Sequence, residues 1–191
     1  FWFAGPIVEK LGPLGLLATS AVLAIAGLYL LSTASGLTAI FVFATLYGFG
    51  KTFFWPTTLG VVSEQCPKGG ALTLNAIAGI GMLAVGILGG PVIGKMTEDS
   101  IKVSVEEATS AETYAKISND STYFLGDYTA VDASKVGDLP EEEQTKVNES
   151  IQSGKQGSLA SVAIFPVFML ACYLVLIFYF KGRGGYKPIE I

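Results

Sequence analysis

The absence of charge over long stretches limits the possible folds of this chain more than any other feature. No charged residue occurs among the 40 residues from Leu11 to Gly50. Two further uncharged runs extend from Gly69 to Gly94 and from Gln156 to Phe180. One helix needs only about 20 apolar residues to cross the hydrocarbon layer of a bilayer. The first run is therefore long enough for two spans, and the pattern indicates an integral membrane protein.

Turn-forming residues divide these runs into four expected transmembrane helices. The small polar segment from Ser32 to Gly36 suits a tight connection between two helices, and Pro67 followed by a Gly pair ends the second one. The chain is 51% hydrophobic, which fits an all-α membrane protein. We expect spans near Leu14–Leu31, Leu37–Val62, Ala71–Ile93 and Leu159–Phe180.

The composition changes abruptly in residues 95–158. This segment holds 13 of the 16 acidic residues and 6 of the 12 basic residues, a net charge of 6 − 13 = −7. Its apolar residues are too few for a large core, so we expect a solvated, partly helical loop. Short helices are predicted at Val105–Ile117 and Pro140–Ile151, because Pro and three Glu suit the start of the latter. The expected divisions are residues 1–94, 95–158 and 159–191.

Basic residues in the short connections predict the orientation. Those on one side of the membrane would be Lys10, Lys68, Lys181, Arg183 and Lys187. The short connection on the other side, Ser32 to Gly36, contains none. Cytoplasmic loops carry the excess of Lys and Arg, whereas loops longer than ~60 residues cross largely regardless of charge. We therefore expect a cytoplasmic C-terminus and an outside location for residues 95–158, in the plasma (inner) membrane.

The start of the chain resembles the end of an earlier helix. It opens on Phe1 without an initiator Met, and no charged leader with a small-residue cleavage site follows. We expect a fragment of a longer polypeptide, whose missing N-terminal half would be its partner within the same chain.

Lys51 is the strongest functional candidate. It lies 14 residues after Leu37 and 13 before Glu64, in a stretch of 28 residues that would form a helix of roughly 42 Å. A lysine near the bilayer midplane costs ~3 kcal/mol and usually faces a cavity or a partner charge. The alternative is that Lys51 snorkels to the headgroups from a tilted helix.

The residues around Lys51 predict a bendable helix that lines a cavity. Tyr47, Lys51 and Trp55 are spaced i, i+4, i+8 and would share one face, which we expect to bind the substrate. Pro56 lacks an N–H group and should kink the helix, with Gly60 on the same small-residue column. Ordinary packing is the alternative for the two aromatic side chains.

Several classes of chemistry are not expected. The chain has no His, and its two cysteines, Cys66 and Cys172, form no pattern of disulfides or metal ligands. Apart from Lys51, the spans carry no cluster of acids, bases or nucleophiles. We therefore expect no enzymatic activity, no cofactor, no metal and no nucleic-acid partner.

The third span is rich in glycine. Gly86, Gly90 and Gly94 repeat at four-residue spacing, which lets two membrane helices approach closely, and Pro91 should bend the helix. This segment also resembles the G-x-x-x-G-P-x-x-G element of the major facilitator superfamily. Ile77 stands where that element has a further Gly.

The segment GPIVEKLG resembles the G-x-x-x-D-R-x-G loop motif of the same superfamily. Gly5, Glu9, Lys10 and Gly12 fall on its positions, with Glu in place of Asp and Lys in place of Arg. In that family the motif fastens helix ends on the cytoplasmic side. An ordinary turn with a charged pair is the alternative.

The order of spans and loops is similar to helices nine to twelve of a twelve-helix major facilitator transporter. The resemblance implies alternating access, with a small solute bound near the midplane between two halves and a proton or sodium ion as coupling ion. A second function class stays open. The spans could form the membrane anchor of an interaction protein whose acidic outer loop is the working part.

Overall fold

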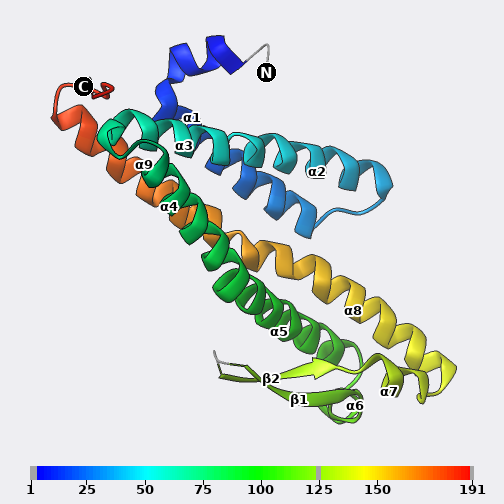
Figure 1. Ribbon diagram of the computed structural model, residues 1–191. Helices are drawn as coiled ribbons and strands as arrows, with labels where there is room; N and C mark the ends of the chain where they lie inside the picture. The colour runs from blue at the N-terminus through cyan, green and yellow to red at the C-terminus, as the bar shows by residue number, and fades with distance from the viewer. Residues whose placement is uncertain (1–3, 124–125, 190–191) are drawn as a thin grey trace. The chain divides into compact units, whose positions relative to one another are not determined.

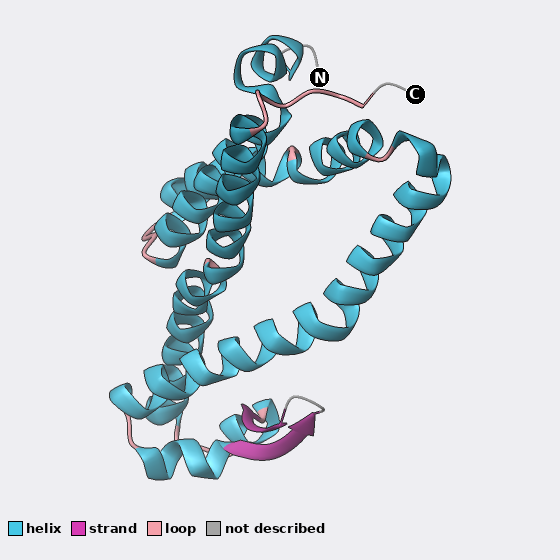
Figure 2. Cartoon of the chain, turned by 90° about the vertical axis from the view of Figure 1, so that its left-hand side faces the viewer, coloured by secondary structure: helices cyan, strands magenta, loops and turns pink. Residues whose placement is uncertain are grey.

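The computed structural model describes residues 4–123 and 126–189, apart from the side chains of residues 4–9 and 123. The described chain is mostly helical and contains one two-stranded sheet (Figures 1 and 2). It divides into two compact units. Unit 1 comprises Phe1–Met82 and Ala163–Ile191, and unit 2 comprises Leu83–Val162.

Unit 1 is built from helices connected by short turns. They are α1 (Ala4–Ser32), α2 (Leu37–Thr52), α3 (Phe54–Gln65), the 3-10 turn η1 (Pro67–Gly69), α4 (Gly70–Leu83, which ends at the boundary of the unit) and α9 (Ile164–Gly182). After the turn at residues 33–36, α2 returns alongside α1 (Figure 1). This arrangement follows from the connection, which is too short for any but an antiparallel neighbour.

Helix α1 supplies the buried face of unit 1. Its buried side chains lie on the sides that α2 and α9 cover, and they are Leu14, Leu16, Leu17, Ser20, Ala21, Ala24 and Leu28. The other helices of the unit expose large apolar side chains, such as Phe41 at 65% and Phe168 at 71%. Such surfaces suit contact with lipid or with further helices.

Unit 2 consists of packed helices and a small two-stranded hairpin. Its elements are the π-helical segment η2 (Ala84–Gly89), α5 (Gly90–Ala108), α6 (Ala111–Ile117), β1 (Ser118–Tyr123), β2 (Gly126–Val131), α7 (Ala133–Gly137) and α8 (Glu141–Val162). The two strands pair antiparallel, in a register that sets Ser118 opposite Val131. Local caps begin the short helices, because Ser110 accepts from the Thr113 N–H at 3.2 Å and Asp132 from the Ser134 N–H at 2.9 Å.

A small apolar core holds unit 2 together. Its buried members come from α5, α6, α7 and α8, and they are Ile101, Val105, Tyr114, Ile117, Val136 and Val147. Burial raises the pKa of Tyr114, whose hydroxyl lies 3.1 Å from Oγ1 of Thr129. Hydrogen bonds from Ser134 hold the pKa of Asp132 below its usual value, because they stabilise the carboxylate.

The predicted number of membrane helices is confirmed. Within residues 4–123 and 126–189, four helical runs are long and apolar enough to cross a membrane, namely Lys10–Ser32, Leu37–Gln65, Pro67–Ala108 and Glu141–Gly182. The last two runs extend well beyond the predicted limits at Ile93 and Leu159. Charged residues end an apolar run without ending a helix, so the helices continue where the hydrophobic pattern stops.

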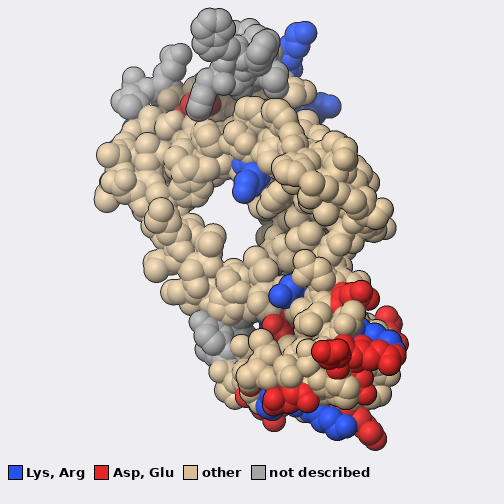
Figure 3. Space-filling view, turned by 90° about the vertical axis from the view of Figure 1, so that its right-hand side faces the viewer, with Lys and Arg blue, Asp and Glu red and all other residues tan. Residues whose placement is uncertain are grey.

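Residues 95–158 are more ordered than the sequence predicts. They contain most of α5, all of α6, α7 and the hairpin, and much of α8. The predicted helix Val105–Ile117 is interrupted, because α5 ends at Ala108 and Ser110 caps α6. Acidic side chains gather over unit 2, whereas the visible surface of unit 1 is mainly uncharged (Figure 3). The outside location of this segment stays a prediction.

Candidate functional site

The helix that carries Lys51 is interrupted in its middle. α2 ends at Thr52, Phe53 follows with φ −88° and ψ −13°, and α3 begins at Phe54. Pro56 has no N–H group to donate to the carbonyl of Thr52, so the regular hydrogen-bond pattern cannot continue through this turn. The Thr52 hydroxyl donates to the carbonyl of Gly48 at 2.7 Å. Whether Pro56 and Gly60 act as a hinge stays a prediction.

Lys51 and Tyr47 lie together on α2. The ammonium nitrogen of Lys51 is 5.5 Å from the centroid of the Tyr47 ring, within the range of a cation–π contact. The Lys51 side chain is exposed. No carboxylate among the described residues forms an ion pair with it, since both ion pairs found there belong to unit 2. The site thus presents an uncompensated positive charge beside an aromatic face.

The third predicted binding residue, Trp55, has a different neighbour. Its ring lies against α4, where a Cβ placed on Gly81 would be 3.3 Å from Cζ3 and Cη2 of the indole. The structure therefore brings Lys51 together with Tyr47 and directs Trp55 towards α4. A shared substrate-binding role for Tyr47, Lys51 and Trp55 stays a prediction.

Two glycines hold the Lys51 segment close to α1, and the sequence reasoning missed both. A Cβ on Gly50 would lie 2.7 Å from the backbone nitrogen of Ala24, and one on Gly27 would lie 2.7 Å from Cα of Tyr47. The hydroxyl of Ser20 is buried in this region, without a hydrogen-bond partner among the described residues. Small residues near these glycines, Ala24 and Ala26 before Gly27 and Gly48 before Gly50, are a sequence signal of close backbone approach between helices.

The glycine-rich segment forms an open groove within unit 2. Gly86, Gly90, Pro91 and Gly94 line a pocket of about 300 Å³ together with Lys95, Gly126 and Tyr128. A Cβ added to Gly86 or Gly94 would meet nothing within 4 Å, so no described helix makes the expected close approach there. That packing stays a prediction. The π-helical turn at Ala84–Gly89 was not predicted, and it precedes Pro91, whose missing N–H leaves the carbonyl of Ile87 without its usual donor.

The resemblance to the loop motif falls partly outside the described residues. The backbone of residues 4–11 is helical instead of forming a loop, and the side chain of Glu9 lies outside those described. Gly12 breaks the helix with φ 66°, a conformation that favours glycine. The Lys10 side chain is exposed. The role of this motif as a fastener of helix ends stays a prediction.

The described residues contain no group of three or more His, Cys, Asp or Glu side chains that could hold a metal ion. Lys51 and Tyr47 can attract an anion or a hydrogen-bond acceptor to the ammonium group and stack a ring on the phenol. Comparisons with known proteins do not assign a family, since no family model, curated protein or solved structure matches the chain.

Proposed function

We propose that this chain is the C-terminal part of a secondary transporter similar to the major facilitator superfamily, which moves a small solute across the membrane by alternating access. The observation that carries the proposal is the charge of Lys51 in the middle of an apolar span. A charge at that depth is costly unless a solute, water or a partner charge compensates it.

The surroundings of Lys51 support a binding role. Its ammonium group and the Tyr47 ring together suit a solute that carries an anionic or hydroxyl group next to a ring or an apolar part. A carboxylate in the N-terminal half of the transporter would be an alternative partner for the ammonium. A proton or sodium ion would then couple transport through that half.

The interrupted helices support a conformational role. Alternating access requires helices that bend near the binding site, and discontinuous helices often form such sites. The break at Phe53 lies two residues after Lys51, and the π-helical turn η2 gives a second irregular point along the chain. The proposal includes no chemical reaction and no bound cofactor.

A second candidate function is supported by unit 2. Its buried core and its acidic surface are more than a simple connection between two spans needs (Figure 3). The spans would then anchor this unit in the membrane for binding to a basic partner protein. The charge of Lys51 has no evident purpose in an anchor, so we favour transport.

A solute panel tests the proposed function. The purified full-length protein should be mixed with sugars, carboxylates and phosphorylated metabolites, and stabilisation against heat should identify candidate solutes. Each candidate should then be offered as a radiolabelled tracer to proteoliposomes, with and without a proton or sodium gradient. Saturable uptake above that of empty liposomes supports transport. Absence of uptake for every stabilising solute contradicts it and favours the anchor.

A further inference from the structure

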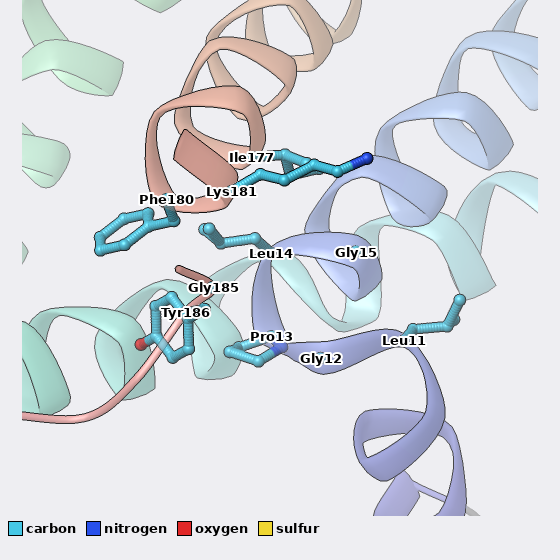
Figure 4. A pocket seen from close by; sticks show the side chains of 10 residues that line it. All are labelled: Leu11, Gly12, Pro13, Leu14, Gly15, Ile177, Phe180, Lys181, Gly185 and Tyr186. Atoms are coloured by element: carbon cyan, nitrogen blue, oxygen red, sulfur yellow. The ribbon is translucent and has the colours of Figure 1, made fainter. Parts of the chain in front are cut away.

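The segment after α9, residues 183–189, is not used by the proposed function. Two consecutive glycines reverse the chain here, because Gly184 and Gly185 have φ values of 91° and 101°, which favour glycine. The N–H of Gly185 donates to the carbonyl of Phe180 at 2.9 Å, which closes the end of α9. We name residues 183–189 the strap segment. Figure 4 shows its path beside α9 and the first residues after the break in α1.

Three hydrogen bonds tie the strap segment to the end of α3. The Tyr186 hydroxyl donates to Oε2 of Glu64 at 2.6 Å, and Nε2 of Gln65 donates to the carbonyl of Lys187 at 2.9 Å. The N–H of Ile189 donates to the carbonyl of Glu64 at 2.9 Å. That carbonyl lies in the last turn of α3, where the helix itself offers no donor. The strap segment therefore continues the hydrogen bonding of α3.

The Tyr186 ring anchors the strap segment to α9. Its centroid is 5.1 Å from that of Phe180, with the two planes at 64°. Tyr186, Phe180, Gly12 and Pro13 line one pocket of about 250 Å³ (Figure 4). One side chain thus contacts α9 with its ring and α3 with its hydroxyl.

The Tyr186 hydroxyl keeps its proton and can therefore donate a hydrogen bond well above neutral pH. Burial, and then the hydrogen bond to Glu64, raise the pKa of Tyr186 to about 12. The phenol therefore stays protonated at neutral pH and donates to the carboxylate. Bonds of this charge-assisted kind are shorter and stronger than bonds between neutral groups.

We propose that the strap segment is a latch that fastens the Gln65 end of α3 to α9, through the bond between Tyr186 and Glu64. α3 lies beyond the break at Phe53, so opening of this latch would release the Gln65 end of α3 from the end of α9. The inference concerns restraint of a helix and holds whether or not the protein transports a solute.

Hydrogen–deuterium exchange of the full-length protein tests the latch. Tyr186→Phe keeps the ring and removes the hydroxyl. It should speed exchange of the Ile189 amide by about tenfold, which corresponds to ~1.4 kcal/mol. The amides of Arg183 and Gly185 bond to Phe180 within α9 and should exchange at the parent rate, which reports that the end of α9 is still folded.

Two further variants make the test specific. Tyr179→Phe removes a hydroxyl from the same part of α9, where Arg183 lies 4.8 Å above the ring, and should leave the Ile189 amide unchanged. Glu64→Ala should speed exchange as Tyr186→Phe does, and the double variant should be no faster than either single one, because both remove the same bond. Unchanged exchange at Ile189 in Tyr186→Phe, or effects that add in the double variant, would overturn the latch.

Discussion

The close approach of α1 and α2 allows a sharp prediction about the helix that carries Lys51. Gly50→Ala places a methyl group 2.7 Å from the backbone nitrogen of Ala24 and 2.9 Å from the carbonyl oxygen of Ser20. Favourable contacts begin near ~3.5 Å, and these neighbours are backbone atoms that cannot rotate away. The two helices must therefore separate, and such overpacking costs roughly 1–3 kcal/mol.

Gly48→Ala is the matched control. It lies on the same helix, and a Cβ there meets nothing within 4 Å. Both variants gain the higher helix propensity of Ala, ~1 kcal/mol, so their difference isolates the clash. Thermal unfolding in detergent should therefore give Gly50→Ala a melting temperature several degrees below that of Gly48→Ala, at roughly 2–4 °C per kcal/mol. Equal melting temperatures would refute the close packing of α1 on α2.

Three further predictions concern unit 2 and the orientation of the chain. Gly154→Ala would place a Cβ 2.5 Å from Cα of Ile101, whereas Gly157→Ala meets nothing within 4 Å, so only the former should lower the resistance of residues 83–162 to limited proteolysis. A Cys at Asp127 in a Cys-free variant should be labelled by an impermeant thiol reagent on intact cells, and a Cys at Gly184 should not; the reverse pattern would overturn the predicted orientation. Replacing residues 105–149 by a short Gly/Ser linker should leave solute uptake intact if the protein is a transporter, because α5 and α8 still meet at Ile101 and Gly154. Loss of uptake with normal insertion would show that unit 2 takes part in transport.

The membrane helices were predictable because a bilayer imposes a simple rule on sequence. Long uncharged runs must become helices, and the small residues from Ser32 to Gly36 mark where the first pair turns. The far ends of α5 and α8 were not predictable from this rule. Beyond the apolar run their stability comes from packing on each other, through Ile101 and Gly154, and no local pattern states that contact.

The hairpin of unit 2 was missed although the sequence carries a signal for it. Thr122, Tyr128, Thr129 and Val131 favour strands, and Gly126 lies between the two runs. The acidic composition of the segment concealed this pattern.

Of the candidate site, the pairing of Lys51 with Tyr47 follows from their spacing of four residues on α2. The contact of Trp55 with α4 does not, because it depends on the packing of two helices and no local pattern states it.

Tracer uptake by full-length Lys51→Met in proteoliposomes, normalised to the inserted protein, tests the proposed transport function most directly. Lys51→Met replaces a charge in the middle of an apolar span by an apolar chain of similar length, which lowers the cost of placing this helix in lipid, so insertion should at least equal that of the parent. Uptake should fall by at least about tenfold, which corresponds to ~1.4 kcal/mol of lost interaction. Lys68→Met, at an exposed lysine of η1 outside the apolar run, should transport like the parent. Lys51→Met with the uptake of the parent would contradict a role for Lys51 in solute binding.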